Sequence, residues 1–177
     1  MVRGGERKLT STETEPGNAF HVIALDTGLV SGVCAITVAT APYITTTSGI
    51  AVSHSSSERS WIHAVAYAER WARSADQYSN VSMCWERYDQ TPGRRVLTPQ
   101  PEAIKANGAL EYISTQCGVT FRQQSRADAK KVVTDKVLRQ LGWYKSTKDG
   151  HANDASRQAG FFLHQNHPEL WMKLLGK

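Results

Sequence analysis

Apolar runs bounded by turn residues divide the chain into short segments that are typical of β-strands. Three such segments follow one another early in the chain and predict an antiparallel meander over residues 21–26, 33–40 and 43–52. A fourth strand is expected to end at Glu86, and a short fifth strand to cover residues 119–122. The pattern therefore predicts five strands.

Apolar residues spaced three and four positions apart predict amphipathic helices between and after these strands. The first follows a cap at Ser57 or Ser60 and reaches about residue 76. The remaining predicted helices run from Pro101 to Gly118, from Ser125 to Gly142, over residues 151–164 and over residues 167–175. In the second helix, the residues expected to face the core are Ile104, Leu110 and Ile113. Elements in this order predict a mixed α/β fold in which helices cover a central sheet.

The length of the chain suits a single domain. A chain of 177 residues buries about 70% of the surface that its unfolded form exposes, which is enough for a real core. Residues 1–19 are polar and show no periodicity, so they predict a flexible N-terminal leader. Residues 20–177 are then expected to form the domain.

The charge of the chain favours a polyanionic partner. Lys and Arg number 21 against 16 Asp and Glu, which gives a net charge of +5 and a pI near 9.2. The excess is concentrated, because residues 122–157 hold nine basic and four acidic side chains. Positive charge of this kind supplies much of the affinity for a phosphate backbone.

Cysteine usage and hydropathy point to the cytoplasm. Cys34, Cys84 and Cys117 are widely spaced in apolar surroundings, which favours core thiols in a reducing compartment over a disulfide framework or a zinc site. No run approaches the ~18 apolar residues of a membrane span, and the N-terminal segment lacks the apolar core of a secretory signal. We therefore expect a cytoplasmic protein without a membrane partner.

Three separate segments each deliver a side chain that can bind a metal ion. One apolar run ends on Asp26, a second ends on Glu86, and His151 and Asp154 lie three residues apart on a predicted helix, where they share a face. Each also has a purely structural explanation when taken singly. Asp26 suits a turn, Glu86 a solvated strand end, and the His151–Asp154 pair the start of a helix. Together they indicate an oxygen-rich site for divalent cations, of the kind that hydrolyses phosphodiesters.

The order and spacing of these motifs resemble RuvC-type Holliday junction resolvases, and most closely their divergent bacteriophage relatives. The motifs are Val-Ile-Ala-Leu-Asp-Thr-Gly at 22–28 with Gly32 after it, a strand ending at Glu86, a helix containing Gly108, the segment 125–136, and His-Ala-Asn-Asp-Ala at 151–155. The resemblance covers roughly residues 20–163. It implies an RNase H-like fold, with a mixed five-stranded sheet flanked by helices, and a homodimer.

The resemblance also implies an active site in which Asp26, Glu86, His151 and Asp154 surround two Mg²⁺ or Mn²⁺ ions. Many family members have Asp at the position of His151, so Asp149 is an alternative ligand. We expect Asp26 to bridge the two ions, Glu86 and Asp154 to hold one each, and His151 to bind an ion or orient the attacking water.

DNA contacts are expected from two further groups of residues. In the family, lysines on or before the penultimate core helix contact the phosphate that is cut, and the matching candidates are Lys130, Lys131 and Lys136, which would equally suit a solvated helix face. In the loop after Glu86, a base could stack on Tyr88, and Arg94 and Arg95 could neutralise phosphates. The loop would also serve as a plain surface loop.

The function implied is a structure-specific, Mg²⁺-dependent endodeoxyribonuclease that resolves four-way junctions or other branched DNA, in the host cytoplasm if a phage encodes it. Flaps and forks remain possible substrates. The main alternative is a junction-binding or DNA-packaging accessory protein without catalysis. An aspartic protease would explain Asp26-Thr27-Gly28 but not the helices or the basic segment, and a sugar kinase or actin-like ATPase would need a longer chain.

Overall fold

The structure is a computed structural model and describes residues 18–40, 50–74, 81–88, 100–146 and 148–176. Its five strands are β1 (Asn18–Asp26), β2 (Ser31–Thr40), β3 (Ile50–Glu58), β4 (Val81–Glu86) and β5 (Thr120–Gln124). They form one sheet in the order β3-β2-β1-β4-β5. The first three pair antiparallel, whereas β4 and β5 run parallel to β1, so the predicted mixed sheet is confirmed.

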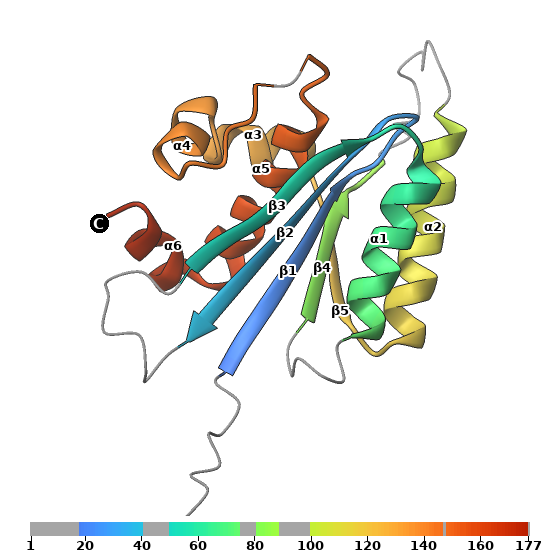
Figure 1. The fold of residues 1–177 in the computed structure, drawn as a ribbon, viewed down its shortest axis with the longest axis horizontal. Helices are drawn as coiled ribbons and strands as arrows, with labels where there is room; N and C mark the ends of the chain where they lie inside the picture. The colour runs from blue at the N-terminus through green and yellow to red at the C-terminus, as the bar shows by residue number, and fades with distance from the viewer. Residues whose placement is uncertain (1–17, 41–49, 75–80, 89–99, 147, 177) are drawn as a thin grey trace, which may run out of the picture.

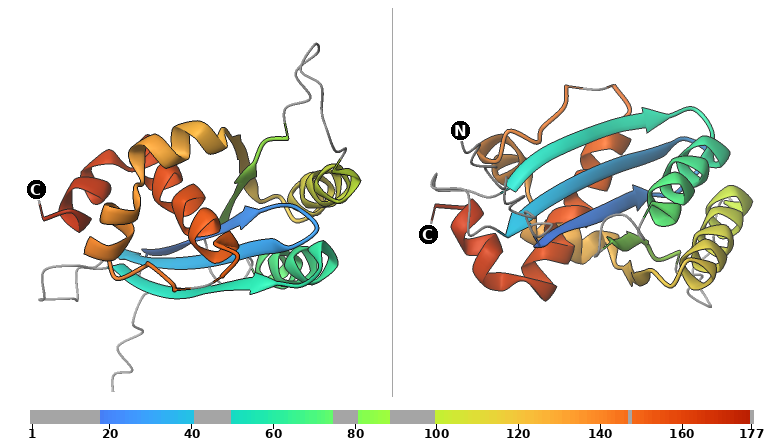
Figure 2. Two further views of the ribbon diagram at one scale, coloured as in Figure 1. Left: turned by 90° about the horizontal axis from the view of Figure 1, so that it is seen from above. Right: turned by 60° about the horizontal axis from the view of Figure 1, so that its bottom comes forward.

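Helices cover both faces of this sheet (Figures 1 and 2). On one face lie α1 (Trp61–Arg73) and α2 (Pro101–Gln116), and on the other lies α5 (His151–Asn166), with α3 (Arg126–Val132), α4 (Asp135–Gln140) and α6 (Pro168–Leu174) around it. Strand β1 is central, and its side chains enter both cores in alternation. Val22 and Ala24 pack with the α5 side, while Ile23 and Leu25 pack with the α1 side. This explains its continuous apolar run.

The third strand reaches further along the chain than predicted, to Glu58 instead of residue 52. Strand β3 spans Ile50–Glu58, whereas the prediction was 43–52, of which residues 43–49 lie outside the described residues. The second half of β3 is rich in serine and has no apolar pattern. Polar residues are tolerated there because β3 lies at the edge of the sheet. Ser57 is therefore a strand residue, and Ser60 caps α1 by accepting a hydrogen bond from the Ile62 amide.

Two helix predictions also need correction. The single helix expected from Ser125 to Gly142 is broken into α3 and α4, because the Thr134 hydroxyl accepts a hydrogen bond from the Val137 amide and caps a new helix. Ile104 is 46% exposed instead of facing the core, whereas Leu110 and Ile113 are buried as predicted.

The described strand β1 begins at Asn18, two residues before the predicted domain start, while the leader before it falls among the residues outside the description. None of the helices within the described ranges is both long and apolar enough to cross a membrane.

Candidate active site

The predicted metal-binding residues come from elements that meet at one edge of the sheet. Asp26 is the last residue of β1 and Glu86 the last of β4, and these strands lie side by side and parallel, with Leu25 opposite Trp85. Both strands therefore end at the same edge. His151 and Asp154 occupy the first turn of α5, whose start packs at this edge. The Nδ1 atom of His151 lies 2.7 Å from Oδ2 of Asp26, which is 3% exposed.

A glycine allows α5 to reach this position. Gly32 lies opposite Asp26 in the β1–β2 pair. A Cβ atom at Gly32 would lie 1.9 Å from the carbonyl oxygen of His151 and 2.4 Å from its carbonyl carbon, so no larger residue fits there. The absence of a side chain lets the first turn of α5 rest on the start of β2 and thereby brings His151 to Asp26.

Glu86 and Asp26 are neighbouring acids that repel each other when both are charged. Burial, a hydrogen bond with Asp26 and the charge of Asp26 raise the pKa of Glu86 to about 8, and Arg126 acts against this shift. The Nε atom of Arg126 lies 3.9 Å from Oε2 of Glu86. The hydrogen bond with Asp26 also raises the pKa of His151. Glu86 therefore keeps its proton at neutral pH, and a cation that binds between the two carboxyl groups would displace it.

Asp154 is held by three basic side chains. Its Oδ2 lies 2.6 Å from Nη2 of Arg126 and 3.2 Å from Nζ of Lys130, and its Oδ1 pairs with Arg157. Burial acts to raise the pKa of Asp154, but the hydrogen bonds and charges of Arg126 and Lys130 outweigh it and lower the pKa. Arg157 is 12% exposed and also pairs with Asp135, which ties α5 to α4. Arg126 thus links Asp154 to Glu86.

The chemistry of the donors fits a hard divalent cation, since Asp26, Glu86 and Asp154 offer carboxylate oxygens and His151 an imidazole. Mg²⁺ commonly takes only one or two carboxylates and completes its shell with water and phosphate oxygens. Across the described part of the chain, however, no three His, Cys, Asp or Glu side chains converge closely enough to hold one ion together. The guanidinium of Arg126 lies between Glu86 and Asp154 in this arrangement.

Three residues of this site were not predicted from the sequence. Arg126 and Arg157 belong to the basic segment, and Arg126 follows the predicted cap Ser125, but only the folded chain reveals their carboxylate partners. Asn107 of α2 accepts a hydrogen bond from the Thr27 hydroxyl (2.9 Å) and donates one to the Glu86 carbonyl (3.2 Å). It therefore fixes the ends of β1 and β4 relative to each other.

The predicted DNA-binding residues fall in different places. Lys130 lies at the acidic cluster, whereas Lys131 pairs with Asp128 at 3.4 Å on the exposed side of α3, and Lys136 is exposed on α4. The Tyr88 hydroxyl accepts a hydrogen bond from the Gln100 amide. Arg94 and Arg95 lie outside the described residues.

The alternative ligand Asp149 is engaged at the start of α5. Its Oδ1 accepts hydrogen bonds from the Ser57 hydroxyl (2.9 Å) and the His151 amide (3.3 Å). Asp149 therefore connects the end of β3 to the helix that carries His151. Its part as a ligand stays a prediction.

Comparison with known proteins identifies the fold. No protein-family model and no curated protein matches the chain. The chain is similar to RuvC from T. thermophilus in complex with a Holliday junction substrate, with a TM-score of 0.53 and 12% identity over 84% of this chain and 96% of that one. It is also similar to a second Thermus thermophilus RuvC structure, with a TM-score of 0.51 and 13% identity over 82% and 95%. The chain has a RuvC-like fold, as the resemblance implied.

Arg126 is expected to compete with metal ions for Glu86 and Asp154. Removing a positive charge within about 4 Å of a site changes its affinity for a cation by an amount on the order of 1–4 kcal/mol. We therefore expect Arg126→Ala to raise the affinity for Mn²⁺, without DNA, by about tenfold, measured by titration calorimetry. Arg139→Ala, which removes an exposed arginine of α4, should leave the affinity unchanged. Weaker Mn²⁺ binding by Arg126→Ala would contradict this competition.

Proposed function

We propose that the protein is a structure-specific endonuclease that cuts Holliday junctions or other branched DNA by two-metal-ion hydrolysis. The observation that carries the proposal is the Asp26–His151 contact, beside Glu86, at the edge of a RuvC-like sheet. The basic side chains around Asp154 support it, because a nuclease needs positive charge next to its metal ligands to hold a phosphate.

Each residue of the cluster has a part in this proposal. Asp26, Glu86, Asp154 and His151 would hold two ions, Mg²⁺ or Mn²⁺, which supply Lewis-acid activation of water and stabilisation of the leaving 3′ oxygen. The Asp26 carboxylate fixes the orientation of the His151 ring through Nδ1. The other ring nitrogen of His151 is then left either to bind an ion or to take a proton from the attacking water.

Arg126 and Lys130 would position the phosphate. Both reach Asp154, so their charges lie at the acidic cluster and not on a remote surface. A scissile phosphate carries the negative charge that these cations need once Asp154 binds a metal ion. In this proposal the two side chains exchange a carboxylate for a phosphate when DNA enters.

A substrate panel tests the proposal. Labelled four-way junction, fork, flap and linear duplex are incubated with the protein, with and without Mg²⁺ or Mn²⁺. We expect cleavage of branched DNA only with a divalent cation, and little cleavage of linear duplex. Binding of the junction without cleavage under either cation would favour the non-catalytic accessory protein instead, and fork or flap cleavage that exceeds junction cleavage would redefine the substrate.

The salt dependence of DNA binding tests Lys130 and Lys131. Each phosphate contact to duplex DNA contributes about 0.9 to the slope of log affinity against log salt. Replacing both lysines with alanine is expected to lower the slope by about 1 to 2, measured by fluorescence anisotropy on a junction. The matched control replaces Lys105 and Lys173, exposed on α2 and α6. An unchanged slope in the first variant would remove both lysines from the interface.

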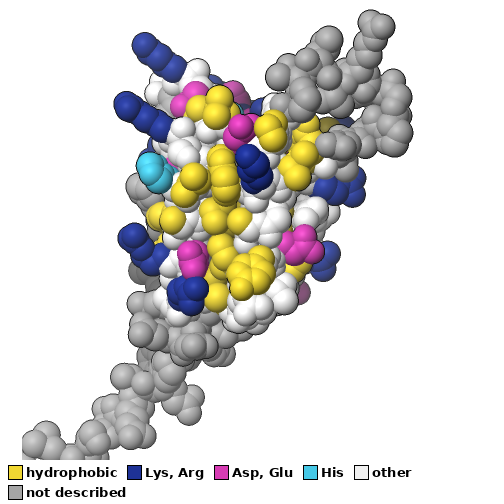
Figure 3. Space-filling view, turned by 90° about the vertical axis from the view of Figure 1, so that its right-hand side faces the viewer, with side chains coloured by type: hydrophobic (Ala, Val, Ile, Leu, Met, Phe, Trp, Pro, Cys, Tyr) yellow, Lys and Arg dark blue, Asp and Glu magenta, His cyan; other side chains and the backbone are white. Residues whose placement is uncertain are grey.

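We propose that the active form is a homodimer that uses the face of α1 and α2. Figure 3 shows hydrophobic side chains gathered along this face. Ile62, Ile104 and Tyr112 are exposed there by 57%, 46% and 66%. Large exposed apolar patches mark association surfaces.

The Ile104→Lys, Tyr112→Lys double variant is expected to shift the protein from dimer to monomer in light scattering, because it places charges in this apolar face. Met172→Lys, on α6 and 44% exposed, is the control and should remain dimeric. A monomeric wild-type protein, or a dimer that survives the double substitution, would rule out this interface.

A further inference from the structure

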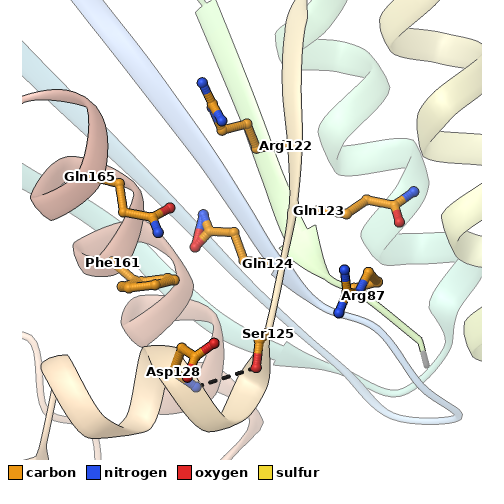
Figure 4. Close-up of a pocket in the computed structure, with 8 residues that line it drawn as sticks. All are labelled: Arg87, Arg122, Gln123, Gln124, Ser125, Asp128, Phe161 and Gln165. Carbon is orange, nitrogen blue, oxygen red and sulfur yellow. Dashed lines mark hydrogen bonds between the residues drawn. The ribbon is translucent and has the colours of Figure 1, made fainter. Parts of the chain in front are cut away.

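A cavity of about 410 Å³ lies against the edge strand β5, beside the acidic cluster but built from other residues. Figure 4 shows Arg122 and Gln124 on the side of β5 that faces α5, where Asp128 of α3 and Phe161 and Gln165 of α5 lie opposite them. The remaining lining residues are Arg87, Gln123 and Ser125. The lining is mostly polar and carries charges of both signs.

Gln124 is the buried polar residue of this cavity. Its side chain is 4% exposed, and its Nε2 donates a hydrogen bond to the Gln158 carbonyl at 3.4 Å. Its Oε1 is buried and has no hydrogen-bond partner among the residues that the structure describes. Buried acceptors without partners are rare and unfavourable. The cavity therefore suits a ligand that donates an N–H or O–H group to this oxygen.

The charged residues narrow the class of ligand. A backbone phosphate suits the charge of Arg87 and Arg122 but offers no hydrogen-bond donor to Gln124. A nucleobase has donors and acceptors on its edges and a flat apolar face. Arginine binds the O6 and N7 acceptors of guanine in bidentate fashion, and the N2 amino group of guanine is a donor that a carboxamide or carboxylate oxygen can accept. Phe161 is largely buried but lines the cavity, so it supplies an apolar contact for a base.

The position of the cavity relates this base to the cleavage site. Gln124 is paired with Glu86 in the β4–β5 register, so the cavity begins one strand away from the acidic cluster. Phe161 lies seven residues after Asp154 on α5, which is about 10 Å along the helix axis. That length corresponds to about three nucleotide steps at 3.4 Å each.

We propose that this cavity binds one unstacked guanine base of the strand being cut and so selects the sequence at which cleavage occurs. The inference rests on the proposed nuclease function, because it assumes that branched DNA lies across the acidic cluster. Branched DNA suits such a site, since bases near the crossover are more easily unstacked than bases within a duplex.

The test measures binding and does not depend on cleavage. Four-way junctions are prepared in which each nucleotide within about three steps of the crossover is changed in turn to every base, together with its pairing partner. Affinities are then measured by anisotropy in EDTA. We expect one position at which guanine binds about tenfold tighter than the other bases. Gln124→Met and Arg122→Ala should each reduce this preference to less than about threefold. Lys173→Ala, an exposed position on α6, is the control.

The outcomes separate this inference from the proposed function. Equal affinities for all bases in the wild-type protein, or a preference that persists in Arg122→Ala, would overturn the guanine pocket and leave the nuclease proposal standing. Arg122 is exposed, so its variant gives an answer even if Gln124→Met fails to fold. Absence of binding to every branched DNA would overturn the proposed function and this inference together.

Discussion

Asp26→Asn is expected to lower the rate of DNA cleavage by about 10³-fold or more while the protein still folds and binds branched DNA. The substitution keeps the size of the side chain and an oxygen that can accept from His151, but it removes the charge of the expected bridging ligand. A loss of about 4 kcal/mol of transition-state stabilisation corresponds to this factor and is within the several kcal/mol that a catalytic metal supplies.

The measurement compares cleavage of a four-way junction at saturating Mg²⁺ with binding of the same junction in EDTA. Glu69→Gln neutralises an exposed carboxylate of α1, whose partner is Arg73, and should leave both quantities unchanged. Normal cleavage by Asp26→Asn would show that the site is misassigned. Loss of junction binding together with cleavage would mean instead that Asp26 maintains the fold.

The central sheet and the position of Asp26 and Glu86 could be predicted because their signal is local. A buried parallel strand is a short apolar run, and a carboxylate directly after it marks the edge at which such strands end. The end of β3 could not be predicted in the same way. This strand lies at the edge of the sheet, and its serine-rich second half has no apolar pattern. The break between α3 and α4 was missed because Thr134 caps a helix inside an otherwise continuous periodic segment.

The cationic half of the candidate site could not be predicted residue by residue. Nine basic side chains in one segment are equally suited to a solvated helix face, and the sequence does not say which of them meets a carboxylate. Tertiary packing decides this, because it brings α3 beside the first turn of α5 and places Arg126 and Lys130 at Asp154. The same packing separates Lys131, the next residue, from the site and pairs it with Asp128.

Gly32→Ala is expected to damage the site through the backbone alone. The new methyl group would lie 1.9 Å from the His151 carbonyl oxygen and 3.1 Å from the Ala152 amide nitrogen. These are backbone atoms of the first turn of α5, so they cannot turn aside as a side chain does, and the helix start must move by more than about 1 Å to reach a normal contact distance. His151 and Asp154 move with it, away from Asp26 and Glu86.

A displacement of about 1 Å at a catalytic site lowers activity on the order of 100-fold, and overpacking a core contact destabilises a protein by about 1–3 kcal/mol. We therefore expect Gly32→Ala to show both a lower melting temperature and a cleavage rate reduced by about two orders of magnitude. Gly108→Ala adds the same methyl group to a helix position with open space around it and should raise stability by about 0.5–1 kcal/mol. If Gly32→Ala melts and cleaves like the wild-type protein, the close approach of α5 to β2 does not position the site, and the Asp26–His151 contact loses its structural basis.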